Sequence, residues 1–100
     1  MKRHSVTIHA EQPPVVELDS AAHAAYVRFS HETIARTEPV TTEGCIVTMD
    51  FDAAGEVVGI ELVGVHEFGI CRLLEKAHVK PLPKHLAERT RYVPADLQLV

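Results

Sequence analysis

The stretch 45–63 alternates polar and apolar residues on both sides of a short turn, and this pattern constrains the fold more than any other feature. Apolar residues take every second position in 45–51 and again in 58–62, which is the period of a strand with one buried face. Between them, Asp52-Ala53-Ala54-Gly55 supplies the residue types of a tight turn. The pattern predicts an antiparallel hairpin with one face on the core.

Four further extended segments are predicted on the N-terminal side of this hairpin. Residues 5–9, 24–29 and 33–38 alternate polar and apolar side chains, and 15–18 is a short extended run that follows two prolines. Only three residues separate 24–29 from 33–38, which is a hairpin-length connection. These two segments are therefore expected to pair as antiparallel neighbours.

After the hairpin the apolar period changes from that of a strand to that of a helix. The apolar positions recur at helical spacing and leave charged residues for the solvent side. We therefore predict one amphipathic helix around 67–77 that covers one face of the sheet. Its expected buried positions are Phe68, Ile70, Cys71, Leu73, Leu74 and Ala77. Cys45 and Cys71 are both expected to be buried, reduced thiols.

Taken together, these segments predict an α+β fold: an antiparallel β-meander of four to five strands, covered on one face by one C-terminal helix. One domain is expected over residues 1–100, with its core at about 5–77. Residues 78–100 form a C-terminal extension, with a short helix over 84–90 that has Pro83 at its first position. Residues 91–93 and 97–100 add an edge strand, join a dimer interface or stay mobile.

Composition and charge exclude several classes of protein. Hydrophobic residues make up 46% and charged residues 24% of the 100 residues, which is typical of globular domains and unlike disordered chains. A formal charge of −4 argues against nucleic-acid binding. No apolar run is long enough to span a bilayer and no signal peptide is recognisable, so a cytoplasmic protein is expected.

Charge is divided unevenly along the chain. Residues 1–70 hold four basic and eleven acidic side chains, whereas residues 71–100 hold six basic and three acidic ones. Such a division indicates that the C-terminal part folds back onto the acidic body or meets an acidic partner. Folding back onto the body is the expectation here.

Three blocks of the sequence, 18–29, 35–38 and 47–61, resemble in order and spacing the small prokaryotic proteins of domain-of-unknown-function family 2283. The most specific block is the third, which contains the acidic hairpin and ends at Gly59-Ile60-Glu61. The resemblance covers about 16–77. It implies a small β-rich protein, and because some members are encoded beside toxin-like proteins, it also implies an antitoxin or interaction role.

The chain departs from the family pattern at three positions. His23 stands where an acidic residue is usual, Ala25 where a larger aliphatic residue is usual, and Leu18 where a tyrosine is usual. A role for the acidic position that His23 replaces is therefore in doubt in this chain. The small Ala25 side chain fills less of the core than the usual larger residue would.

Two patterns suggest metal or cysteine chemistry, and both have a simpler interpretation. The stretch 50–55 begins like a calcium loop, but Ala54 stands at the position of the third ligand, and Asp and Gly are also what a hairpin turn requires. The seven histidines contain no metal-ligand spacing. The best constellation, His66 with Cys71 and His78, does not share one helix face. No catalytic residue, metal ligand or cofactor is therefore predicted.

The polar side chains of the predicted sheet favour a protein-interaction role. We expect a non-enzymatic interaction module of antitoxin-like kind, whose acidic surface binds a small basic protein. The partner-binding residues are expected to be Arg28, Glu38, Asp50, Asp52 and Glu61. The competing hypothesis is a small metal-dependent or carboxylate-based enzyme, with its site near the 50–55 hairpin or His66.

A homodimer is also expected. One sheet covered by one helix makes a thin core, and a second copy could add apolar contacts through the uncovered face or through a free edge of the sheet.

Overall fold

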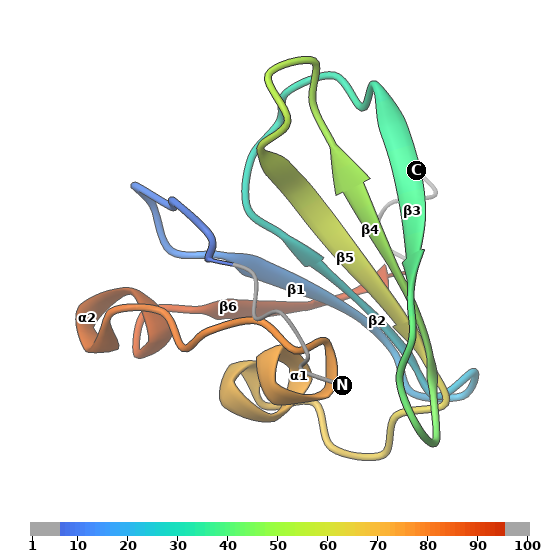
Figure 1. The fold of residues 1–100 in the computed structure, drawn as a ribbon. Coiled ribbons are helices and arrows are strands. Elements are labelled where there is room, and N and C mark those ends of the chain that lie inside the picture. The colour runs from blue at the N-terminus through green and yellow to red at the C-terminus, as the bar shows by residue number, and fades with distance from the viewer. Residues whose placement is uncertain (1–6, 96–100) are drawn as a thin grey trace.

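The computed structural model describes residues 7–95, and within them the chain forms a six-stranded mixed sheet with two short helices. The strand order is β3-β4-β5-β2-β1-β6, with only the β1–β6 pair parallel. Both helices lie on the same side of the sheet (Figure 1). The strands are β1 (Val15–Asp19), β2 (Ala24–Arg28), β3 (Arg36–Val40), β4 (Ile46–Phe51), β5 (Val57–Val63) and β6 (Arg91–Pro94), and the helices are α1 (Ile70–Lys76) and α2 (Lys84–Ala87).

The predicted hairpin is confirmed as β4 and β5, which pair antiparallel with Met49 opposite Ile60. Both of these side chains are buried. The turn closes through a hydrogen bond from the Gly55 amide to the Asp52 carbonyl, 3.0 Å long. Gly55 has a φ of 85°, a conformation that glycine adopts without steric cost.

The predicted meander of four to five strands under one helix is wrong. Within the described residues the sheet has six strands with two helices on one side, and β2 pairs with β1 and β5 rather than with β3. The segment 29–35 crosses the ends of β5 and β4 and delivers β3 to the far edge of the sheet (Figure 1). Its two ends are tied down by hydrogen bonds from the Phe29 amide to the Val58 carbonyl and from the Ala35 amide to the Phe51 carbonyl. β3 begins after this connection, at Arg36. Pro39 fits within β3 because the strand lies at the edge of the sheet, where a residue without an amide hydrogen can face away from the neighbouring strand.

The predicted N-terminal strand over 5–9 is not found in its described part. Residues 7–10 are not in a strand, and residues 5 and 6 lie outside the described part of the chain. Ile8 is nevertheless buried and belongs to the core cluster. The alternating pattern in this segment therefore reflects the burial of one side chain, that of Ile8, and not a strand.

The core lies between the sheet and the helices. The sheet contributes Val16, Val27, Val47, Ile60 and Leu62, and α1 with the residue after it contributes Ile70, Leu73, Leu74 and Ala77. Val79, Leu82 and Leu86 extend this core to α2. No helix within residues 7–95 has the length and apolar composition to span a bilayer.

Two details of the helices differ from the sequence predictions. Cys71 is exposed rather than buried, because buried positions at 70, 73, 74 and 77 fill one helical stripe and residue 71 lies outside it. The other thiol, of Cys45, is half-buried. The helices also run over fewer residues than expected, and Pro83 precedes α2 as its N-cap.

The C-terminal strand fastens α1 to the sheet. β6 lies parallel to β1, with Tyr92 opposite the buried Val16. The Tyr92 hydroxyl accepts a hydrogen bond of 2.9 Å from the Ile70 amide, at a helix start where Gly69 offers no side-chain cap. The predicted strand over 97–100 lies outside the described residues.

The orientation of α1 is testable with two substitutions. Leu73→Ala should lower the free energy of unfolding by about 2–5 kcal/mol, because it removes a side chain with no exposed area from the core. Cys71→Ala should change it by less than about 0.5 kcal/mol. Urea denaturation measures both, and equal losses would contradict this placement of the helix.

Candidate interaction face

The side of the sheet away from the helices carries polar side chains in two cross-strand rows, and we call it the outer face. In the first row Glu17, Tyr26, Glu61 and Thr48 lie side by side on β1, β2, β5 and β4. In the second row Arg28, Gly59, Asp50 and Thr37 lie side by side on β2, β5, β4 and β3. Strand alternation puts these residues here, since their sequence neighbours point into the core.

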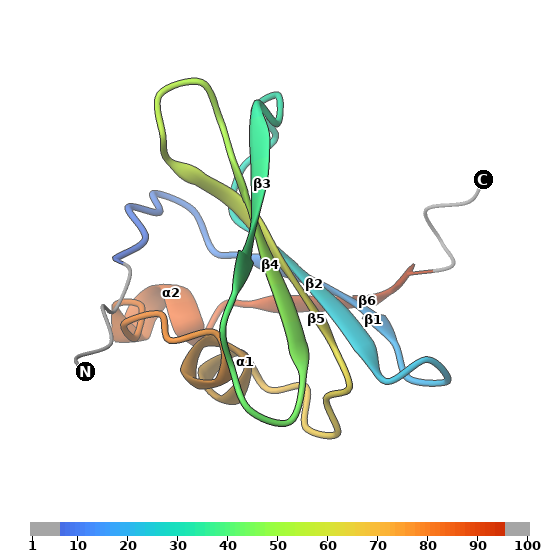
Figure 2. The same ribbon diagram turned by 45° about the vertical axis from the view of Figure 1, so that its right-hand side comes forward.

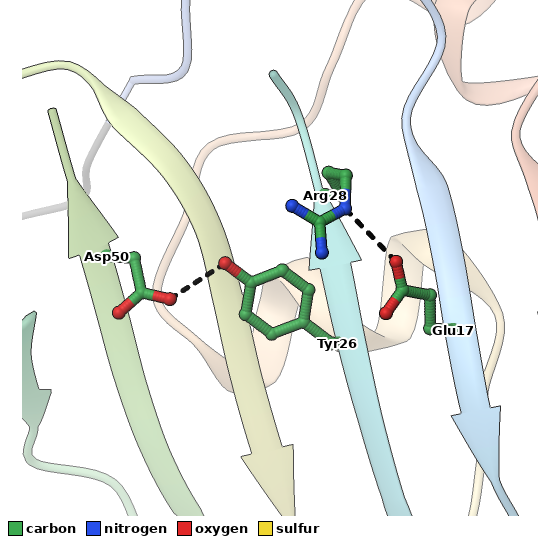
Figure 3. Close-up of polar contacts among 4 residues, drawn as sticks. All are labelled: Glu17, Tyr26, Arg28 and Asp50. Atoms are coloured by element: carbon green, nitrogen blue, oxygen red, sulfur yellow. Dashed lines mark hydrogen bonds and ion pairs between the residues drawn. The ribbon is translucent and has the colours of Figure 1, made fainter. Parts of the chain in front are cut away.

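Tyr26 connects the two rows. Its hydroxyl donates a hydrogen bond of 2.7 Å to Oδ2 of Asp50 on β4, so the side chain reaches across the intervening strand β5 (Figure 3). The Thr37 hydroxyl donates to the other Asp50 oxygen. Asp50 is thereby held between β2 and β3, with a partner for each carboxylate oxygen.

Gly59 makes this crossing sterically feasible. A Cβ atom at residue 59 would lie 2.1 Å from the hydroxyl oxygen of Tyr26 and 2.3 Å from the ring carbon that bears it. Glycine weakens a strand interior in general, and it commonly marks a place where another group approaches the backbone closely. Here that group is the Tyr26 ring.

Arg28 and Glu17 form an ion pair beside the same ring. Arg28 Nε donates to Glu17 Oε2 at 3.0 Å (Figure 3), and the side chains are 28% and 12% exposed. The guanidinium carbon also lies 5.0 Å from the centre of the Tyr26 ring, within range of a cation–π attraction. The pair is thus partly shielded from solvent and is oriented by two contacts.

The surroundings of Tyr26 favour the protonated form of its hydroxyl group. Burial raises its pKa above the ordinary value for tyrosine, and the hydrogen bond to Asp50 and the charge of that carboxylate raise the pKa further. Arg28 acts in the opposite direction and only partly offsets the shift. At neutral pH the group is therefore a hydrogen-bond donor and not a base.

A groove of about 460 Å³ opens on the outer face over these residues. Its charged lining consists of four carboxylates and one guanidinium, those of Glu17, Asp19, Asp50, Glu61 and Arg28. Within the described residues the Glu61 carboxylate has no hydrogen bond or ion pair, and the residue is exposed. The groove has an excess of negative charge, with Glu61 as its least compensated carboxylate.

The structure brings together three of the five residues that the sequence predicted as partner-binding. Arg28, Asp50 and Glu61 all line the groove. Glu38 lies on the opposite face of the sheet, because it pairs with the buried Met49, and it contacts Arg36. Asp52 lies in the β4–β5 turn, where its Oδ1 accepts 2.9 Å hydrogen bonds from the amides of residues 54 and 56.

Neither Glu17 nor the role of Tyr26 was predicted from the sequence. Glu17 lies between the core-facing residues of β1, so alternation alone would have put it on the outer face. Its contact with Arg28 depends on the β1–β2 register, and the Tyr26–Asp50 bond depends on a strand order that was predicted incorrectly.

A second groove of about 510 Å³ lies between the segment 8–13, the segment 28–32 and the base of the β4–β5 turn. It also contains carboxylates, those of Glu11, Glu32, Asp52 and Glu56. Most of its lining comes from connections rather than strands, and Asp52 is already used to stabilise the turn. Strands hold side chains more precisely than connections do, so the outer-face groove is the better-defined site.

A family model described as "Protein of unknown function (DUF2283)" matches residues 16–65. The chain belongs to the DUF2283 family. The match runs from the second residue of β1 to beyond the end of β5 and includes every charged residue of the outer-face groove, whereas α1, α2 and β6 lie beyond it. No curated protein and no solved structure matches the chain. The DUF2283 match confirms the predicted resemblance and supplies no activity.

The steric relation between Gly59 and Tyr26 gives a prediction for this DUF2283 chain. Gly59→Ala should lower the free energy of unfolding by about 1–3 kcal/mol, because the new Cβ displaces the Tyr26 ring from Asp50. In a Tyr26→Ala background the same change should be neutral or stabilising, since alanine is better than glycine within a strand. A double-mutant cycle by denaturant unfolding measures this coupling, and additive effects would contradict the geometry.

The raised pKa of Tyr26 gives a second prediction. Because the hydroxyl ionises at a higher pH in the folded chain than in the unfolded chain, its contribution to stability is present below about pH 10 and is lost as the pH rises above that value. Tyr26→Phe has no proton to lose, so its free energy of unfolding should fall less steeply in alkaline solution. Parallel pH profiles for the two chains would show that the hydroxyl is not held as described.

Proposed function

We propose that this chain is a non-enzymatic protein-interaction module whose outer face binds a basic segment of a partner protein. The observation that carries the proposal is the groove in which four carboxylates face one guanidinium. Complementary charge across an interface speeds association and selects partners. A lysine- or arginine-rich segment is the natural complement of such a groove.

The contacts of the carboxylates support binding over catalysis. Both oxygens of Asp50 accept hydrogen bonds from hydroxyl groups, and Asp52 stabilises the turn. A carboxylate acting as an acid or base needs access to a reacting group and a suitably shifted pKa. Within residues 7–95, no three His, Cys, Asp or Glu side chains converge as a metal-ligating group. Glu61 and Arg28 are better suited to contacting a charged partner.

The C-terminal part leaves the groove acidic. Within the segment 71–95, the part that belongs to α1 and α2 packs on the helix side of the sheet through apolar residues such as Leu74 and Leu86, and β6 joins the sheet beside β1. Their described ion pairs are local, joining Arg72 to Glu67 and Glu75 and Lys84 to Glu88. No basic side chain of this segment lines the groove, although Arg91 lies beside Val15 of β1 on the same side of the sheet as Arg28. The groove itself therefore keeps its excess of negative charge. A small basic protein, as in an antitoxin-like pair, is the partner we favour.

The same charge makes the outer face poorly suited to pairing with itself. Two copies that met through this groove would bring eight carboxylates together against two guanidinium groups, and like charges across an interface are unfavourable. A homodimer, if it forms, should use another surface, such as the free edge of β3. The outer face is then left for a different protein.

Charge reversal at Glu61 tests the proposed function. The partner is first identified by affinity capture with the tagged chain from its native cells and mass spectrometry, and association rates are then measured at low salt. Glu61→Lys should slow association by roughly tenfold, because it reverses the least compensated charge of the groove.

Glu43→Lys is the matched control. Glu43 is exposed in the connection between β3 and β4 and lies outside the groove, so its reversal changes the net charge equally. This variant should slow association by less than about twofold. Equal effects of the two variants, or no effect of either, would overturn the assignment of the outer face.

A further inference from the structure

Two histidines from distant parts of the sequence lie in contact at one end of the sheet. His23 is in the turn between β1 and β2, and His66 is in the connection between β5 and α1. Their ring centres are 4.6 Å apart, and the rings are tilted by 55°. Both residues are exposed. The pair is on different elements from the outer-face groove and does not depend on the proposed function.

The backbone fixes the two histidines relative to each other. The His23 carbonyl accepts hydrogen bonds from the amides of Gly64 and Val65, at 2.8 and 2.9 Å. Val65 directly precedes His66, so these bonds tie the turn that carries one ring to the connection that carries the other. Figure 1 shows this connection passing beside the β1–β2 turn. Backbone hydrogen bonds between the two segments therefore hold the rings close together.

His23 has a φ of 52°, in the left-handed region that few residues other than glycine adopt. Histidine is among the residues that tolerate this region, together with Asn and Asp. The conformation is needed here because the chain must reverse between β1 and β2 within four residues, while its carbonyl faces Gly64. The position of the ring therefore follows from the turn.

We propose that His23 and His66 together form a two-histidine site for a divalent transition-metal ion such as Zn²⁺. Imidazole nitrogens bind Zn²⁺ at about 2.0–2.1 Å, so two nitrogens on a tetrahedral ion are about 3.4 Å apart. Because each nitrogen lone pair points radially out of its ring, two imidazoles on one tetrahedral ion have their centres about 5 Å apart. The observed separation of 4.6 Å is close to this value. The rings are tilted by 55° rather than stacked in parallel, so rotation about the side-chain bonds can bring one nitrogen of each ring to a shared ion.

The chemistry of the pair selects the class of metal. Neutral imidazole suits Zn²⁺, Cu²⁺ and Ni²⁺, whereas Ca²⁺ and Mg²⁺ require oxygen ligands. Within residues 7–95 no third His, Cys, Asp or Glu completes a metal-ligating group with the pair. The remaining coordination positions would therefore be taken by water, which makes the site weaker than a four-ligand structural zinc site. Binding should weaken in acid because only unprotonated imidazole coordinates.

Calorimetric titration of the untagged full-length chain with ZnCl₂ tests this site. We expect one Zn²⁺ to bind per chain, and His66→Gln and His23→Asn each to weaken binding by roughly tenfold or more. Asparagine at residue 23 tolerates the left-handed conformation, so the turn is retained. The double variant should lose little beyond either single variant, because two ligands that act together are not additive.

Matched controls separate the pair from the other exposed histidines. His31→Gln and His85→Gln remove exposed imidazoles elsewhere and should leave Zn²⁺ affinity unchanged within about twofold. Circular dichroism checks that each variant is folded. Imidazole resonances of His23 and His66 should shift together in NMR spectra as Zn²⁺ is added. Absence of saturable binding, or binding that both substitutions leave intact, would overturn the proposal.

Discussion

The Tyr26 side chain crosses β5 because residue 59 has no side chain of its own, and the arrangement of the outer face depends on this contact. It links β2 to β4 through Asp50, which in turn holds Thr37 of β3. On its other side the ring lies beside the Arg28–Glu17 pair, which joins β2 to β1. The contacts of the Tyr26 ring, together with the next partners of Asp50 and Arg28, thus link the five neighbouring strands β1 to β5. The Tyr26 ring thus links strands on the outer face, and α1 packs against the strands on the opposite face.

Local periodicity predicted a large part of the fold. The β4–β5 hairpin, the turn at Asp52 and the amphipathic character of α1 follow from spacings of two and of three to four residues, which act within one element. The alternation predicted over 24–29 is also found in β2, with Val27 buried and Tyr26 on the outer face. These features need no knowledge of which strands are neighbours.

The remaining features depend on contacts between distant segments. A short connection suggested that β2 pairs with β3, but the ends of β4 and β5 bind that connection and carry β3 to the edge. Cys71 is apolar enough to fit a core, yet the helical stripe excludes it. The Tyr26–Asp50 bond and the His23–His66 contact each join residues more than twenty positions apart. Neither residue spacing nor composition encodes such pairs without the strand order.

The proposed function requires that the outer face, rather than another acidic surface, receives a basic partner. NMR amide spectra of the isotope-labelled chain, recorded during titration with a short lysine- and arginine-rich peptide, locate the surface that binds. Binding at the outer face should concentrate the shifts around Tyr26, Asp50 and Glu61, and added salt should reverse them. Shifts concentrated instead in the second groove, around Glu11 and Glu56, would contradict it.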